Sequence, residues 1–71
     1  MTVEDILREA IQGEIESHLL YTEAADMVQA DHVKQALNEL ALEENGHKLA
    51  LEKMLANPAS ISYSVRKLQE E

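Results

Sequence analysis

Three residues of the sequence have the types and spacing that metal chemistry needs. Glu44 and His47 lie three residues apart in a segment with the apolar periodicity of a helix, so their side chains share one face. On one face, a carboxylate oxygen and an imidazole nitrogen can bind the same ion. Glu14 takes the corresponding inward position in an earlier segment. Glu14, Glu44 and His47 are therefore the candidate metal ligands.

The composition predicts the long helices that would position these side chains. Gly occurs twice and Pro once among 71 residues, and cysteine is absent. Without cysteine, the chain forms no disulfide and no zinc site of the cysteine type. An all-α domain of this length buries only a modest core, so we expect a metal ion or a partner chain to support it.

The charge balance separates the classes of partner. Fourteen acidic residues against six basic ones give a net charge of −8, which repels the phosphates of nucleic acid and favours cations. The first residues lack the basic region and apolar block of a signal peptide, and no apolar run is long enough to span a membrane. We expect a cytoplasmic protein that binds neither nucleic acid nor membranes.

The first predicted helix begins near Val3, where Thr2 and Asp5 resemble a capping box. An inward stripe then advances in steps of four and three: Leu7, Ile11, Glu14, His18, Tyr21, Ala25 and Val28. A parallel stripe consists of apolar or small residues: Ile6, Ala10, Gly13, Ser17, Leu20, Ala24 and Met27. This wide arc predicts contacts with more than one neighbour.

The second predicted helix has one inward stripe: Val33, Leu37, Leu40, Glu44, His47, Leu51 and Met54. The step of five from Val28 to Val33 breaks the phase and predicts a turn near residues 29–31, with Asp31 as the helix cap. An uninterrupted helix over residues 3–56 is the alternative. Because the stripe continues in phase beyond Asn45 and Gly46, these residues are expected within the helix rather than at a turn.

The sequence divides at the Asn57-Pro58 step, which is expected to end the second helix. Residues 1–57 form the predicted hairpin, and residues 58–71 form a C-terminal segment. Ile61, Val65 and Leu68 predict a short third helix there, beginning near Ser60 or Ser62.

An antiparallel hairpin places Glu14 and Glu44 at one level, whereas a continuous helix would separate them by roughly 45 Å. Neither stripe contains a Lys or Arg that would neutralise the buried groups, so a bound cation is expected. One hairpin supplies half of the ligands of a carboxylate-bridged dinuclear site in a four-helix bundle. Two copies would complete that site, so we expect a homodimer that holds two ions.

The pattern of Glu14, Tyr21 seven residues later, and Glu44-Asn45-Gly46-His47 resembles the ferritin-like di-iron proteins. The resemblance covers about residues 3–56. It is strongest to the short half-bundle type of encapsulated ferritins, which have rubrerythrin relatives. It implies a ferroxidase centre that binds Fe(II), reduces dioxygen and yields Fe(III) for iron storage or detoxification.

In the family, the residue that matches Glu14 bridges two irons, those that match Glu44 and His47 are terminal ligands, and Tyr21 matches a tyrosine near the centre. Glu16 matches an acid on the iron-entry path, whereas Gly13 stands where the family has another acid. Mn or Zn fits the same ligands. The resemblance also implies an encapsulin shell as a partner. The wide apolar arc of the first helix predicts a higher assembly, such as a ring of dimers.

Several of these residues have simpler interpretations. Tyr21 is also a candidate core residue, and His18 is a core histidine, a residue behind the ligands, or an extra ligand. His32 is expected to be solvated, and Met27 and Met54 are expected in the core. Two alternative functions remain: a rubrerythrin-like peroxidase with an external electron donor, and a metal-free dimerisation or adaptor module.

Overall fold

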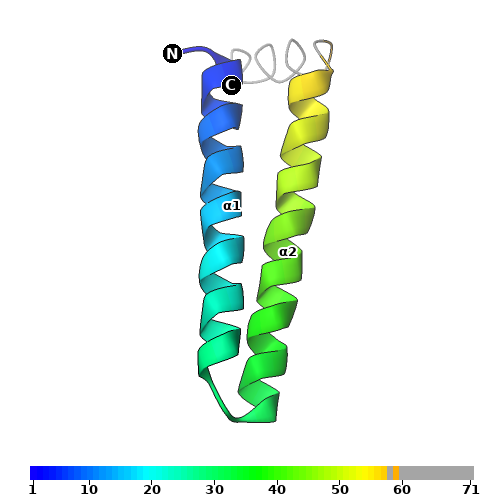
Figure 1. Ribbon diagram of the computed structural model, residues 1–71. Coiled ribbons are helices and arrows are strands. Elements are labelled where there is room, and N and C mark those ends of the chain that lie inside the picture. Colours follow the sequence, from blue (N-terminus) through cyan, green and yellow to red (C-terminus); the bar gives the residue numbers. More distant parts are fainter. Residues whose placement is uncertain (58, 60–71) are drawn as a thin grey trace, which may run out of the picture.

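The computed structural model describes residues 1–57 and residue 59 and contains two long helices, α1 (Val3–Met27) and α2 (Asp31–Ala56). They run antiparallel, side by side, and are joined by a short linker (Figure 1). The hairpin prediction is confirmed, and the uninterrupted helix is wrong because α1 ends at Met27. The predicted third helix, which would begin near Ser60 or Ser62, lies outside the described residues.

The start of α1 has the predicted capping box. The Thr2 backbone N–H donates to Asp5 Oδ2 at 2.9 Å, and the Asp5 backbone N–H donates to Thr2 Oγ1 at 3.1 Å. These two bonds satisfy N–H groups that have no partner within the helix. Glu4 and Asp5 also place negative charge at the positive end of the helix dipole.

The start of α2 differs from the prediction. Ala30 is the N-cap residue and Asp31 is the first helical residue, so Asp31 does not cap the helix with its side chain. Its carboxylate acts on the helix dipole instead, as an acid in the first turn. Asn45 and Gly46 lie within α2, as predicted, and Asn57 is its C-cap residue.

The contact line between the helices, called the seam below, uses the predicted inward stripe of α1 in full. All seven residues of that stripe are half-buried or buried. On α2 the prediction is only half correct, because Val33, Leu40, His47 and Met54 are exposed. Their places in the seam are taken by residues one position later along the chain, which are at least half-buried: Lys34, Ala41, Lys48 and Leu55.

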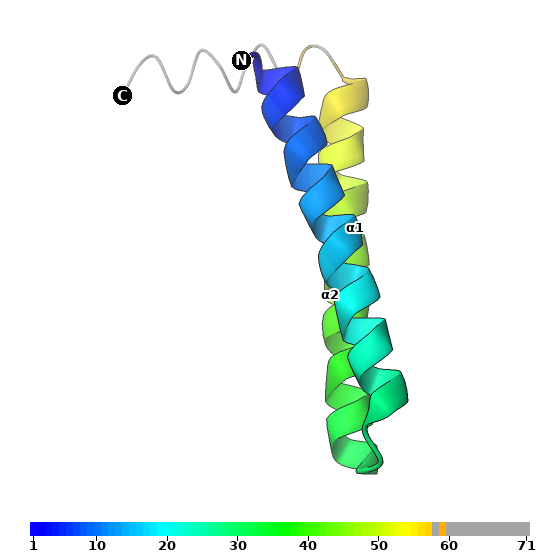
Figure 2. The ribbon, with the colours of Figure 1, turned by 60° about the vertical axis from the view of Figure 1, so that its left-hand side comes forward.

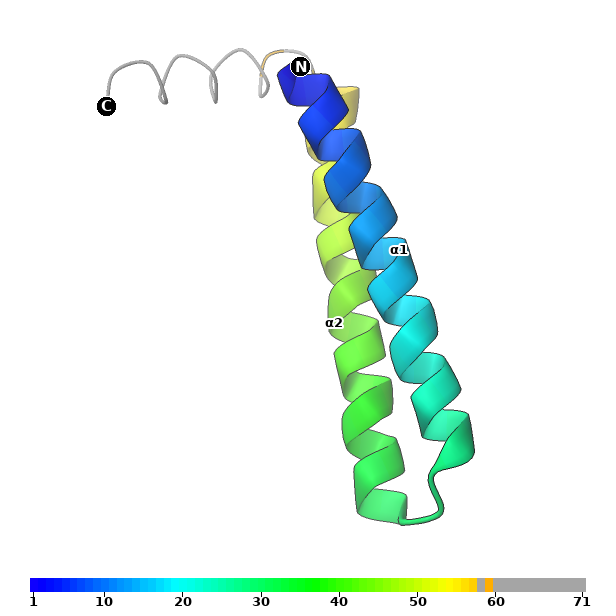
Figure 3. The ribbon, with the colours of Figure 1, turned by 90° about the vertical axis from the view of Figure 1, so that its left-hand side faces the viewer.

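Two hydrogen bonds from a side chain to a backbone carbonyl cross the seam and set its register. His18 Nδ1 donates to the carbonyl oxygen of Ala41 at 2.8 Å, and Lys34 Nζ donates to that of Ala25 at 2.8 Å. Both pairs are centred on the same point of the chain, between residues 29 and 30. The register therefore stays constant along the hairpin, and the helices remain side by side while crossing at a small angle (Figures 2 and 3).

The hairpin has almost no interior. Among the described residues only Ala25 and Ala41 are buried, each 2% exposed. Large apolar side chains lie open to solvent along both helices, among them Ile6, Leu20 and Leu40. Within residues 1–57 neither helix is long and apolar enough to cross a membrane.

Lys34→Met should lower the free energy of unfolding by about 1–2 kcal/mol. The carbonyl of Ala25 lies in the last turn of α1, where no basic residue is present, and Lys34 donates to it from the start of α2. Lys53→Met, which removes an exposed lysine, is the matched control and should change stability by less than about 0.5 kcal/mol. Urea unfolding followed by circular dichroism measures both values, and equal effects would contradict the role of Lys34.

Candidate metal centre

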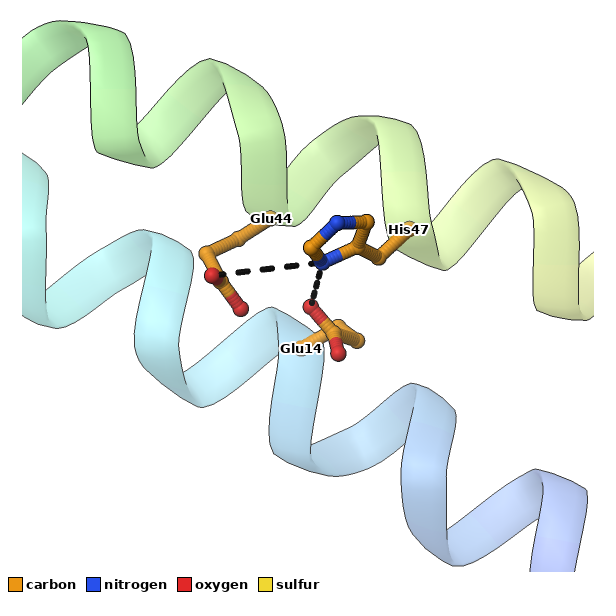
Figure 4. A group of neighbouring side chains, drawn as sticks. All are labelled: Glu14, Glu44 and His47. Atoms are coloured by element: carbon orange, nitrogen blue, oxygen red, sulfur yellow. Dashed lines mark ion pairs between the residues drawn. The ribbon is translucent and has the colours of Figure 1, made fainter.

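The hairpin brings the three predicted ligands together between α1 and α2. Glu14 extends from α1, and Glu44 and His47 extend from α2 toward it (Figure 4). His47 Nδ1 lies 3.3 Å from Glu14 Oε2 and 4.0 Å from Glu44 Oε1. One ligand atom from each residue lies within 4.8 Å of those of the other two. This convergence requires the antiparallel register, because Glu14 and Glu44 are 30 residues apart in the chain.

The two carboxylates are crowded. A shared hydrogen bond with Glu14, removal from water and the negative charge of Glu14 raise the pKa of Glu44 above that of an ordinary glutamate. The side chains of Glu14 and Glu44 are 22% and 19% exposed, whereas that of His47 is 61% exposed. The pair is thus partly withdrawn from water, and the imidazole lies at its open side.

Glu14 has an unsatisfied atom at the centre of the group. Its Oε2 is buried and has no hydrogen-bond partner. No Lys or Arg forms an ion pair with either carboxylate in the part of the chain that the structure describes. A buried carboxylate oxygen that has no hydrogen bond and lies beside an imidazole nitrogen and a second carboxylate belongs to a donor set that a divalent cation would satisfy.

A hollow of about 200 Å³ reaches Glu14 from the side of the seam opposite His47. Its wall contains side chains from both helices: Glu14, Ile15, His18, Leu19, Asn45 and Lys48. Asn45 and Lys48 were not predicted to lie here. Their inward position follows from the shift of the α2 seam by one residue. The sequence did not indicate this position, because a polar residue is not expected in a seam.

The other candidate residues lie outside the group of three. Tyr21 is half-buried in the seam, two helical turns from Glu14, and His18 donates to the backbone of α2. His32 is exposed, as expected. The prediction that Met27 and Met54 belong to the core is wrong, since they are 82% and 43% exposed. Both side chains lie beside the seam rather than in it.

Glu16, the residue that matches an acid on the iron-entry path, is exposed on α1. It lines a shallow hollow over that helix together with Glu23 and Asp26. The neighbouring Gly13 is also exposed, and a Cβ atom at this position would meet no other atom within 4 Å.

Comparison with known proteins agrees with the geometry. The family model of rubrerythrin matches residues 5–68, which include α1 from Asp5 onward, the whole of α2 and all three candidate ligands. Comparison with curated proteins and with solved structures gives no match. The match covers most of the chain and includes a Glu and a Glu-x-x-His set that converge on one point. The chain therefore belongs to the rubrerythrin family, a ferritin-like di-iron family.

Proposed function

We propose that the protein is a di-iron ferroxidase that oxidises Fe(II) with dioxygen, for iron storage or detoxification. One observation carries the proposal: Glu14 Oε2 is buried without a hydrogen bond and faces Glu44 and His47. Family membership supports iron as the metal. Carboxylate oxygens suit the hard Fe(III) product, and an imidazole nitrogen helps to hold Fe(II) before oxidation.

The residues would divide the work by position. By the resemblance to the family, Glu14 would bridge a pair of irons, and Glu44 and His47 would be terminal ligands. Bound iron supplies the electrons that dioxygen accepts. Tyr21 lies in the same seam two turns away and would contribute packing, a redox role, or both.

The centre would be completed by a second copy of the chain. A bridged di-iron site in a four-helix bundle uses two Glu residues and two Glu-x-x-His sets, and one hairpin supplies one of each. His47 stands on one face of the hairpin, called the site face. On each helix, the residues of this face recur at intervals of seven, and all of them are exposed. They are Ile6, Gly13, Leu20 and Met27 on α1, and Val33, Leu40, His47 and Met54 on α2.

A two-fold partner on the site face would therefore cover exposed apolar side chains and add the missing ligands in one step. Two hairpins with the structure described above would then form the predicted four-helix bundle. A ring of dimers, a cytoplasmic location and an encapsulin shell stay predictions from the sequence.

A peroxidase that uses the same site is the second candidate, because the matching family is rubrerythrin. It would reduce hydrogen peroxide with electrons from an external donor, since the chain has no cysteine to hold a second iron centre. The Fe(II)-loaded protein should consume dioxygen faster if it is a ferroxidase, and hydrogen peroxide faster if it is a peroxidase. The metal-free adaptor is excluded if the protein binds iron.

Anaerobic titration should show Fe(II) binding that saturates near one iron per chain. Admission of air should then give the near-ultraviolet absorbance of Fe(III). Glu44→Ala should abolish this oxidation because it removes a terminal ligand, whereas Glu43→Ala, at an exposed neighbouring acid, should leave it unchanged. Hydrogen peroxide in place of air tests the second candidate. Fe(II) binding that survives both Glu44→Ala and His47→Ala would contradict the assignment of these residues as ligands.

Metal should promote dimerisation through the site face. In sedimentation velocity with Fe(II) or Zn(II), the wild type should shift from monomer toward dimer, and Glu14→Ala should weaken this shift while leaving helicity intact. Leu40→Gln should also weaken it, because Leu40 lies on the site face one turn before Glu44. Leu42→Gln, two residues along the same helix and 68% exposed on another side, is the uncharged control. Equal effects of the two leucine variants would contradict the assigned face.

The metal-free protein should lose stability as the pH rises above about 4.5, the ordinary pKa of a glutamate. The pKa of Glu44 is raised in the folded state, so the proton bound there stabilises the fold at acidic pH, and this contribution is lost above the folded-state pKa. Glu44→Gln keeps a hydrogen-bonding group without the charge and should flatten the trend. Thermal unfolding in EDTA measures this, with Glu52→Gln, at an exposed acid farther along α2, as control. Parallel pH curves for the wild type and Glu44→Gln would rule the effect out.

A further inference from the structure

We propose that His18 is a positioning residue that holds α2 in the register at which Glu44 is level with Glu14. His18 Nδ1 donates to the carbonyl oxygen of Ala41 across the seam at 2.8 Å. His18 follows Glu14 by one helical turn, and Ala41 precedes Glu44 by three residues. The bond therefore joins the two helices about one turn from both carboxylates. Only the metal-binding part of its test rests on the proposed function.

The position of this bond along the hairpin gives it a particular importance. Within the described residues, two hydrogen bonds from a side chain to a backbone carbonyl cross the seam, and the other one, from Lys34 to Ala25, lies next to the linker. Beyond His18, toward the free ends of the helices, residues such as Leu7 and Leu51 make the seam. Apolar contacts are not directional and resist sliding less than a hydrogen bond does. The bond from His18 is thus the last directional contact before the metal ligands.

Close approach of the helices at this point depends on the acceptor residue. Ala41 is only 2% exposed, and its small side chain lets the ring of His18 reach the backbone of α2. Since a carbonyl oxygen only accepts, Nδ1 must carry the proton, and a neutral imidazole is sufficient. What matters is a donor at the position of Nδ1, so asparagine, which carries an amide N–H₂ group at a similar place, should replace it.

A small error of register would matter at the metal centre. A slip of one residue moves a helix by about 1.5 Å along its axis, with a rotation of about 100° if the seam is to be remade. Metal ligands require placement to a few tenths of an ångström. Loss of the His18 bond should therefore change the metal centre before it unfolds the hairpin.

The first test measures Co(II) binding and its visible absorption spectrum, which reports the geometry of the ligands. His18→Leu should weaken Co(II) binding by about tenfold or more and change the spectrum, in line with losses at residues that orient ligands. His18→Asn should restore both. Lys34→Met removes the other bond across the seam, far from the site, and should leave Co(II) affinity and spectrum unchanged.

The second test measures register without metal. Spin labels are attached to cysteines introduced at Glu9 and Ala50, which are exposed and lie at the same level of the two helices, because they share the midpoint of the two bonded pairs. The chain has no other cysteine, and an excess of unlabelled chain removes signals between copies. His18→Leu should broaden or shift the distance distribution, while His18→Asn should keep it narrow.

These results separate the possible failures. If the wild type binds no Co(II), the proposed function fails, and the spin-label distances still test the role of His18. If His18→Leu retains the wild-type distance distribution, or the Co(II) spectrum of a wild type that binds the ion, the positioning role is overturned. An equal loss of Co(II) affinity in Lys34→Met would also overturn it, because a general loss of stability would then explain both variants.

Discussion

A single seam between two antiparallel helices determines how the side chains of the hairpin are placed. Both hydrogen bonds that cross it are centred between residues 29 and 30, so each residue of α1 has a defined neighbour on α2. Glu14 meets Glu44 and His47 because of this register and for no local reason. The linker of three residues between Met27 and Asp31 lies at the far end of the hairpin, yet its length helps to set the register that brings the metal ligands together.

Two helices with one seam cannot enclose an interior. The two buried residues of the described chain are alanines, and both lie where a side chain from the other helix reaches the backbone. The work that a hydrophobic core does in a larger domain must then come from elsewhere. In the proposed dimer, the same exposed face that lacks a partner also holds the open side of the ligand group. Folding, assembly and metal binding would thus be parts of one equilibrium.

The sequence predicted the two helices, the turn and the level of the carboxylates, because each depends on periodicity and chain length. It failed on which side of α2 faces α1. Large apolar residues such as Leu40 and Met54 favoured one line, but the seam needs small Ala41 for close approach and tolerates the apolar stem of Lys34. Hydropathy marks residues that avoid water, and it does not tell a contact within the chain from one with a second copy. Asp31 failed as a cap because the helix begins one residue earlier than its side chain requires.

Because the register is constant, the hairpin can be shortened by paired deletions in the two helices without moving the remaining side chains to other faces. The seam and the site face both repeat every seven residues, so removal of seven residues from each helix, at equal distances from the linker, would leave every remaining side chain on its face. Removal of one residue from α2 between the linker and Glu44 would instead rotate both of that helix's ligands by about 100°. Insertions and deletions compatible with the site are therefore paired across the two helices and come in multiples of a heptad.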